Sequence, residues 1–338
     1  MRVERLDLTA WANALPSSGF EVFHTPEALK VLREHAPGEL RLYGGFKGEQ
    51  AIALLPLVVR RRSVGTAVFS PPPSMGVPRL GPIMMSPSPK RRKRERVNRE
   101  FTKEVLDDLD LDASLSLFRM VCGTDYPDPR PYSWNEMRVN PYFTYVLDTE
   151  GTSTDDLLSS FSKSLRREIR DAEDTDVTVE AVPASEGAKL VYEDAKSRYE
   201  EQGETYQLSW PYVRDLTNAL SETGRCRVYL ARAPDGEYLS GITALYSNDM
   251  AYFWQGGTVS DYDGTTINSL IHWRIIQDIA DGEAPIDSVT SYDLMGANTE
   301  RLCRYKAKFG AELVPYYTVE SSGVGMDMAK KAYSFING

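Results

Sequence analysis

The 338-residue sequence contains no apolar run of the roughly 18 residues that a membrane-spanning helix needs. Its first residues include acidic side chains and no apolar core, so they do not resemble an export signal. Three cysteines, Cys122, Cys226 and Cys303, lie far apart, which excludes the closely spaced pairs of a redox CxxC site and argues against a disulfide framework. We therefore expect a cytoplasmic protein with no integral membrane segment and, at most, peripheral contact with a membrane.

Histidine is equally rare, and the motifs of most enzyme classes are missing. The three histidines are widely separated, and none of the patterns GxGxxG, GxxxxGK[ST], HExxH or GxSxG occurs. These absences argue against dinucleotide binding, P-loop phosphate binding, zinc proteolysis and Ser-His hydrolysis. We expect no metal site and no cofactor.

The charge balance is acidic, with 49 Asp and Glu against 39 Lys and Arg, a formal net charge of -10. Such a balance argues against a protein coated for nonspecific nucleic-acid binding. One segment, residues 90–99, is nevertheless strongly basic and reads KRRKRERVNR. Its residues Arg91, Arg92 and Lys93 are candidate contacts to RNA phosphates, and a solvated run of charge is the alternative.

The length predicts two domains. Apolar periodicity and turn residues predict a series of helices and strands in each half. In the first half the predicted helices cover 25–36 and 94–109, and the strands cover 40–46, 51–59, 116–121 and 142–148. The proline-rich stretch 71–89 is too long for an idle connection, so we expect it to line a site.

The sequence pattern of the second half predicts three helices, followed by a meander of three strands and then by alternating helices and strands. The predicted helices cover 154–172, 185–202, 210–222, 265–280 and 299–308, and the strands cover 226–233, 238–247, 250–256, 288–294 and 311–317. The strand, turn and strand over 40–57 are echoed over 226–245, which suggests a duplicated fold. The alternative is that any two hairpins look alike.

Several motifs of the second half resemble one family. Residues 160–173 read SFSKSLRREIRDAE, residues 252–257 read YFWQGG, residues 292–296 read YDLMG and residues 300–310 read ERLCRYKAKFG. Together they resemble the Fem family of non-ribosomal aminoacyl transferases, whose pattern ends in a strand with Asp and Gly and then a helix reading Phe-Lys-x-x-Phe-Gly. Tyr305 stands here in place of the first Phe.

The resemblance implies an α/β fold of two GNAT-like domains, each a mixed central sheet flanked by helices. We place them at 1–150 and 151–320, and expect the C-terminal segment 321–338 to return to the first domain. It also implies an acyltransferase that forms an amide on an amine acceptor. Fem enzymes use an aminoacyl-tRNA donor and a cell-envelope precursor as acceptor. An acyl-CoA-dependent GNAT N-acyltransferase and an inactive module that binds a peptide or a glycolipid headgroup are the alternatives.

The resemblance also assigns roles to residues. Lys306 would supply the positive charge that stabilises the oxyanion of acyl transfer, and a surface lysine on an amphipathic helix is the alternative. Asp293 would position or deprotonate the amine, or else cap the next helix. The candidate substrate-binding residues are Arg166, Arg167, Tyr206, Trp254 and Arg304.

The donor site of acetyl-CoA-dependent GNAT enzymes is a glycine-rich [RQ]xxGx[GA] loop that holds pyrophosphate at a helix N-terminus. In the corresponding place this sequence reads SDYDGTTIN, residues 260–268. Asp261 and Asp263 would repel a pyrophosphate, and Gly264 is the one glycine left. CoA is therefore disfavoured in this half of the chain, although an acyl-CoA donor stays open.

Overall fold

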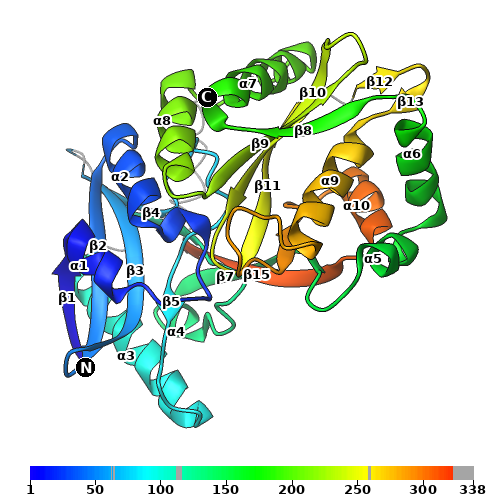
Figure 1. The fold of residues 1–338 in the computed structure, drawn as a ribbon. Helices are drawn as coiled ribbons and strands as arrows, with labels where there is room; N and C mark the ends of the chain where they lie inside the picture. Colours follow the sequence, from blue (N-terminus) through cyan, green and yellow to red (C-terminus); the bar gives the residue numbers. More distant parts are fainter. Residues whose placement is uncertain (62, 64, 112–115, 258–259, 323–338) are drawn as a thin grey trace. The chain divides into compact units, whose positions relative to one another are not determined.

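The structure is a computed structural model that describes residues 1–61, 63, 65–111, 116–257 and 260–322. The chain divides into two compact units (Figure 1). Unit 1 comprises 1–142 together with the described residues from 315 onward, and unit 2 comprises 143–314. The bounds of the units fall within two long strands, β7 (Met137–Asp148) and β15 (Glu312–Ser321), which have residues in both units. The predicted return of 321–338 lies outside the described residues except for Ser321 and Ser322.

Unit 1 is a mixed sheet with helices, as predicted. Within its sheet β4 and β6 are parallel, and the pairs β1 with β2, β2 with β3, β3 with β4, and β6 with β15 are antiparallel. The strands, in order across the sheet, are β1 (Arg2–Leu6), β2 (Glu39–Lys47), β3 (Gln50–Arg61), β4 (Thr66–Ser70), β6 (Ser116–Val121) and β15, with β5 (Ile83–Met84) beside β3. The helices are α1 (Leu8–Ala14), η1 (Val22–His24), α2 (Pro26–His35), α3 (Arg91–Leu109) and α4 (Arg130–Ser133).

Local sequence explains where the elements of unit 1 begin and end. Helix α2 starts at Pro26 because the side chain of Thr25 accepts a hydrogen bond from the amide of Ala28. The β2–β3 hairpin turns at Gly48, whose φ of 62° lies in the left-handed region that glycine adopts without strain. Helix α3 is anchored by Phe101 and Val105, which belong to the apolar core of the unit.

A buried ion pair fixes the proline-rich stretch of unit 1. The Arg79 guanidinium donates to both carboxylate oxygens of Glu21, at 2.9 and 3.2 Å, and both side chains are buried. The amide of Thr124 also donates to Glu21, at 3.4 Å. The bidentate pair therefore ties together three segments that lie far apart in the sequence.

The strands of unit 2 also include parallel and antiparallel pairs. β11 and β14 are parallel, and the pairs β7 with β14, β10 with β11, β9 with β10, and β8 with β9 are antiparallel. The strands, in order across the sheet, are β7, β14 (Ser291–Asp293), β11 (Met250–Gly256), β10 (Tyr238–Tyr246), β9 (Cys226–Arg232) and β8 (Thr178–Val182). The helices are α5 (Thr154–Ser160), α6 (Lys163–Glu173), α7 (Ala184–Glu201), α8 (Trp210–Ser221), α9 (Asn268–Ala280), α10 (Glu300–Lys306) and η2 (Ala307–Phe309).

Two elements of unit 2 differ from the sequence prediction. The helix predicted over 154–172 is two helices, because Phe161 is buried at the end of α5 and Ser162 caps the start of α6 through the amide of Leu165. The helix predicted from residue 265 starts at Asn268, because a short hairpin of β12 (Asp261–Tyr262) and β13 (Thr265–Thr266) precedes it.

Candidate active site

Strand β14 ends in a turn whose backbone is held by Asp293. Met295 and Gly296 both have positive φ, 56° and 63°, a conformation that is unfavourable for methionine. The Asp293 carboxylate is fully buried, and its Oδ1 accepts hydrogen bonds from the Thr144 hydroxyl at 2.5 Å and from the Met295 amide at 2.7 Å. The carboxylate thus fixes the turn from inside the sheet.

Lys306, the last residue of α10, reaches this turn. Its Nζ donates to the carbonyl oxygen of Gly296 at 3.2 Å and lies 5.6 Å from the centre of the Phe253 ring. The residue is 5% exposed, so it is not the surface lysine of the alternative interpretation. Burial lowers the pKa of Lys306 to about 8, although the negative charge of Asp293 acts to raise it. The amine is therefore charged at neutral pH and close to titration.

An aromatic cluster surrounds this amine. The His272 ring lies 4.8 Å from that of Phe253 and 5.4 Å from that of Phe309, and its Nδ1 is 2.9 Å from the hydroxyl of Tyr292. Burial, together with the positive charge of Lys306, lowers the pKa of His272 to about 3. His272 is therefore neutral at physiological pH and packs against the ring that underlies Lys306.

Of the residues predicted to bind substrate, Trp254 lies near the end of β11 and Tyr206 contacts this strand. The pairing of β10 with β11 shifts between Thr243 and Ala244, so Trp254 is an extra residue in the strand, a β-bulge. Next to it, the side-chain amide of Gln255 donates to the hydroxyl of Tyr206 at 2.8 Å. Among the described residues, Gln255 Oε1 and the hydroxyl of Thr243 are buried without a hydrogen-bond partner. Sequence analysis did not single out these two polar groups.

Part of the chain that contains these residues matches a known protein family. Residues 159–307 match the model of the acetyltransferase (GNAT) domain. This range contains the turn after β14, the bulge in β11 and Lys306. Residues 159–307 therefore carry a GNAT-type acyltransferase domain, and the chain shares its fold with FemX. No curated protein matches the sequence.

Solved structures share the fold at low sequence identity. FemX is 14% identical, with both chains covered in full and a TM-score of 0.69. The C-terminal domain of a putative lysylphosphatidylglycerol synthetase from Agrobacterium fabrum is 12% identical, with 98% of this chain and 95% of that chain covered and a TM-score of 0.54. A tandem GNAT protein from the clavulanic acid biosynthesis pathway is 11% identical, with 95% and 99% covered and a TM-score of 0.52.

The arginines predicted to bind substrate lie on the helices of the GNAT domain, each with a partner. Arg166 on α6 donates to the carbonyl oxygen of Ser159 at 2.6 Å. Arg167 pairs with Asp171 of the same helix at 3.3 Å, and Arg304 pairs with Glu300 of α10 at 2.5 Å. Exposed pairs within one helix are weak, so both guanidiniums can exchange a carboxylate for a ligand. Their substrate role stays a prediction.

The segment 260–268, which sequence analysis compared with the CoA loop of GNAT enzymes, contains the β12–β13 hairpin. Asp263 and Gly264 form its turn with φ values of 51° and 75°. The amide of Ser260 donates to the side chain of Asn268, the first residue of α9, at 3.0 Å. A hairpin that contains Asp261 and Asp263 therefore directly precedes α9.

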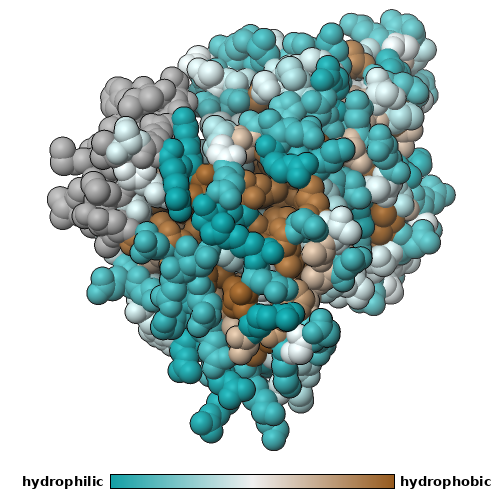
Figure 2. Space-filling view, turned by 90° about the vertical axis from the view of Figure 1, so that its left-hand side faces the viewer, coloured by the Kyte–Doolittle hydropathy of each residue, from teal (hydrophilic) through white to brown (hydrophobic). Residues whose placement is uncertain are grey.

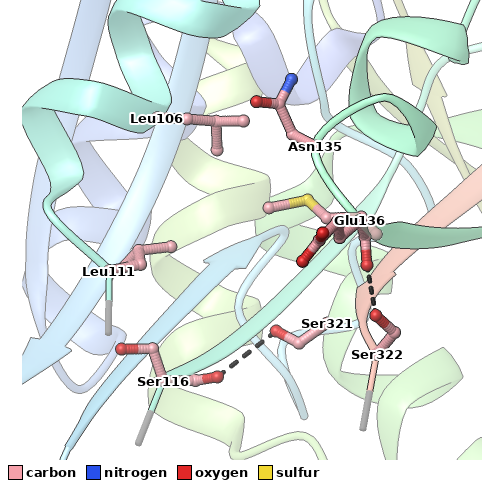
Figure 3. A pocket seen from close by; sticks show the side chains of 8 residues that line it. Leu106, Leu111, Ser116, Asn135, Glu136, Ser321 and Ser322 are labelled. Carbon is pink, nitrogen blue, oxygen red and sulfur yellow. Dashed lines mark hydrogen bonds between the residues drawn. The ribbon is translucent and has the colours of Figure 1, made fainter. Parts of the chain in front are cut away.

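Unit 1 carries the predicted RNA contacts and a small pocket. Arg91, Arg92 and Lys93 are exposed at the start of α3. Near the other end of α3, a pocket of about 200 Å³ is lined by Leu106, Leu111 and the turn at Glu136 (Figure 3). The pocket has one titratable side chain among its described lining residues, so it lacks the groups for acyl transfer. No helix in the described part of the chain is both long and apolar enough to cross a bilayer.

Proposed function

We propose that this acyltransferase forms an amide on an amine acceptor and that Lys306 stabilises the oxyanion of the reaction. The acceptor nitrogen attacks the carbonyl carbon of the donor, and the carbonyl oxygen becomes an oxyanion. Collapse of this intermediate breaks the bond to the donor oxygen or sulfur, which leaves with the proton that the amine loses. The ammonium of Lys306 acts on the oxyanion, and its burial strengthens the interaction because the local dielectric is low.

The single observation that carries this proposal is the burial of Lys306 beside the turn at Gly296. A buried ammonium is costly, and the charge of Lys306 is retained at neutral pH with the help of Asp293. Strongly perturbed amines of this kind are concentrated at functional sites. Because Asp293 is itself fully buried, we assign it the role of positioning Lys306 rather than of deprotonating the acceptor.

For the donor, we propose an aminoacyl-tRNA. The segment with Asp261 and Asp263 lies before α9 and has carboxylates where the sequence pattern of CoA-binding GNAT enzymes has glycines, which disfavours acyl-CoA. The exposed Arg91, Arg92 and Lys93 of α3 offer contacts to RNA phosphates, and FemX shares the fold. The acceptor in this proposal is an amine on a cell-envelope precursor, met in the cytoplasm or at the membrane surface.

A second candidate is an acyl-CoA-dependent N-acyltransferase. The observation that favours it is the match of residues 159–307 to a domain model described as an acetyltransferase. The two candidates share the role of Lys306 and differ in the donor, so donor binding separates them.

Thermal unfolding of the purified chain tests the donor. We expect aminoacyl-tRNA to raise the melting temperature, since a ligand that binds only the native state stabilises it, and we expect the shift to shrink in higher salt. Acetyl-CoA should give no shift. A shift with acetyl-CoA alone would establish the second candidate instead. If neither donor shifts the melting temperature, the result would favour an inactive binding module and overturn the proposed function.

A further inference from the structure

Unit 1 contains a groove of about 690 Å³ beside the N-terminal half of α3. Its volume is that of a typical small-molecule site. Three segments line it: α3, the end of the proline-rich stretch at Met84, Met85 and Ser86, and the connection 125–130 between β6 and α4. In Figure 1, α3 begins at the lower edge of the view, and the lower edge of the face drawn in Figure 2 is hydrophilic.

One side of α3 forms a wall of this groove. Arg91, Arg94, Glu95 and Asn98 line it, and their spacing of three and four residues places them on the same side of the helix. Asn98 is buried at its base, where its amide donates to the carbonyl oxygen of Asp128 at 2.7 Å and its Oδ1 accepts from the hydroxyl of Tyr126 at 2.9 Å. Because these polar groups are paired, the base is preorganised.

The carboxylates on the wall are already committed to arginines. Glu95 Oε1 accepts from Arg91 at 2.9 Å and from Arg130 at 2.8 Å. Asp128 accepts from Arg130 at 2.6 Å. The hydrogen bonds from Arg130 and Arg91 lower the pKa of Glu95, and those from Arg130 lower the pKa of Asp128, so both carboxylates stay charged. The carboxylate of Glu95 thus accepts hydrogen bonds from two guanidinium groups.

Arg94 differs from Arg91 and Arg130, the other two arginines of the groove. It is exposed, and its side chain has no ion pair or hydrogen bond within the part of the chain that the structure describes. It lies one turn from Arg91, whose ion pair with Glu95 is solvent-exposed and therefore weak. The wall consequently presents two guanidinium forks to the groove that an incoming anion can engage.

We propose that this groove binds a phosphate-bearing ligand, with Arg94 as the principal phosphate contact and Arg91 as its neighbour. Guanidinium forks match phosphate oxygens in geometry and charge. Met84 and Met85 provide an adaptable apolar surface for the remainder of the ligand. The phosphate can belong to a soluble phosphate ester or to an anionic lipid headgroup, since both present the same chemistry. The site lies in unit 1 and does not depend on the role of Lys306.

Helix α3 supplies a matched control for this proposal. Arg92 is exposed on the same helix and does not line the groove. Arg92→Gln and Arg94→Gln therefore remove the same charge from neighbouring positions. A diffuse field of positive charge responds equally to both variants, whereas a built site responds to Arg94→Gln.

The test is isothermal titration of the full chain and both variants with inorganic pyrophosphate and with glycerol 3-phosphate, together with sedimentation on vesicles containing phosphatidylglycerol. We expect binding that Arg94→Gln weakens at least tenfold and Arg92→Gln less than about twofold, with unchanged melting temperatures. Loss of soluble-ligand binding alone identifies a phosphate ester, and loss of vesicle binding identifies a lipid headgroup. Equal effects of the two variants on the binding of these small phosphates and vesicles, as expected for a diffuse field of positive charge, would overturn the proposal. Absence of binding to every probe would also overturn it.

Discussion

Lys306 Nζ donates a hydrogen bond of 3.2 Å to the carbonyl oxygen of Gly296. Gly296 belongs to the left-handed turn that the carboxylate of Asp293 holds through the Met295 amide, and Thr144 donates to the same carboxylate. Three hydrogen bonds, together with the backbone from Met295 to Gly296, therefore connect the buried hydroxyl of β7 to the amine of α10. The position of the amine is set in part by this backbone turn.

Removal of the amine should abolish most of the activity. For Lys306→Ala we expect kcat to fall by about 10²–10³, the loss typical of one oxyanion donor. Lys308→Ala is the control, because Lys308 lies two residues away and pairs with Glu168 at 2.6 Å. Steady-state kinetics of both variants checks this, with circular dichroism to confirm folding. Equal losses in the two variants would contradict the assignment of Lys306.

Buried Lys306 should lower the free energy of unfolding at neutral pH. Burial lowers the pKa of Lys306 to about 8 from its ordinary 10.5. Between these values the unfolded chain binds the proton that the folded chain has released, so stability rises with pH through this window. Lys306→Met should flatten that rise and raise the free energy of unfolding at pH 7 by about 1–3 kcal/mol. Urea unfolding from pH 7 to pH 10 measures both effects, and a variant less stable than the parent at pH 7 would refute this prediction.

The sequence predicts those features of the site that depend on residues close together in the chain, and not those that depend on residues far apart. The position of Lys306 follows from the local pattern RYKAKFG, in which Phe309 is buried and Gly310 ends the element with a positive φ of 67°. The contact between Thr144 and Asp293 spans 149 residues and has no local signal. The sequence therefore indicates the amine and does not indicate what holds it.

Other features were hidden because they depend on register or on capping. Opposite Thr243, Gln255 takes its place only because Trp254 is inserted as a bulge, and nothing within this seven-residue strand marks where the extra residue falls. The break between α5 and α6 follows from the cap at Ser162, within a segment whose apolar spacing suits one long helix. The hairpin before α9 was missed because β12 and β13 have two residues each.

The hydroxyl of Thr144 should be needed for the geometry of the site. Thr144→Val leaves the buried carboxylate of Asp293 without one donor, which should cost about 1–3 kcal/mol of stability. We also expect kcat to fall with little change in KM, because the turn at Gly296 loses a support. Thr144→Ser keeps the hydroxyl and should restore both quantities. If the serine variant behaves like the valine variant, packing rather than the hydrogen bond explains the effect.

The ion pair of Glu21 and Arg79 should dominate the stability of unit 1. Arg79→Met leaves Glu21 buried without its main partner and should destabilise the protein by about 3–5 kcal/mol. The double variant Glu21→Gln with Arg79→Met should lose less than the sum of the single losses, since no unpaired charge remains. Guanidinium unfolding of the three variants gives the coupling. Additive losses would show that the two side chains act independently.

The charge on Lys306 is the central claim, and the pH dependence of kcat/KM tests it most directly. The profile is measured for the parent and for Lys306→Arg, with the donor identified by thermal unfolding. In the parent, kcat/KM should fall as pH rises through about 8, where Lys306 loses its proton. In Asp293→Asn this fall should move to lower pH, because the negative charge that raises the pKa of Lys306 is gone. Arginine stays protonated, so the residual activity of Lys306→Arg should show no fall near pH 8. A fall at the same pH in the parent and in Lys306→Arg would contradict the account.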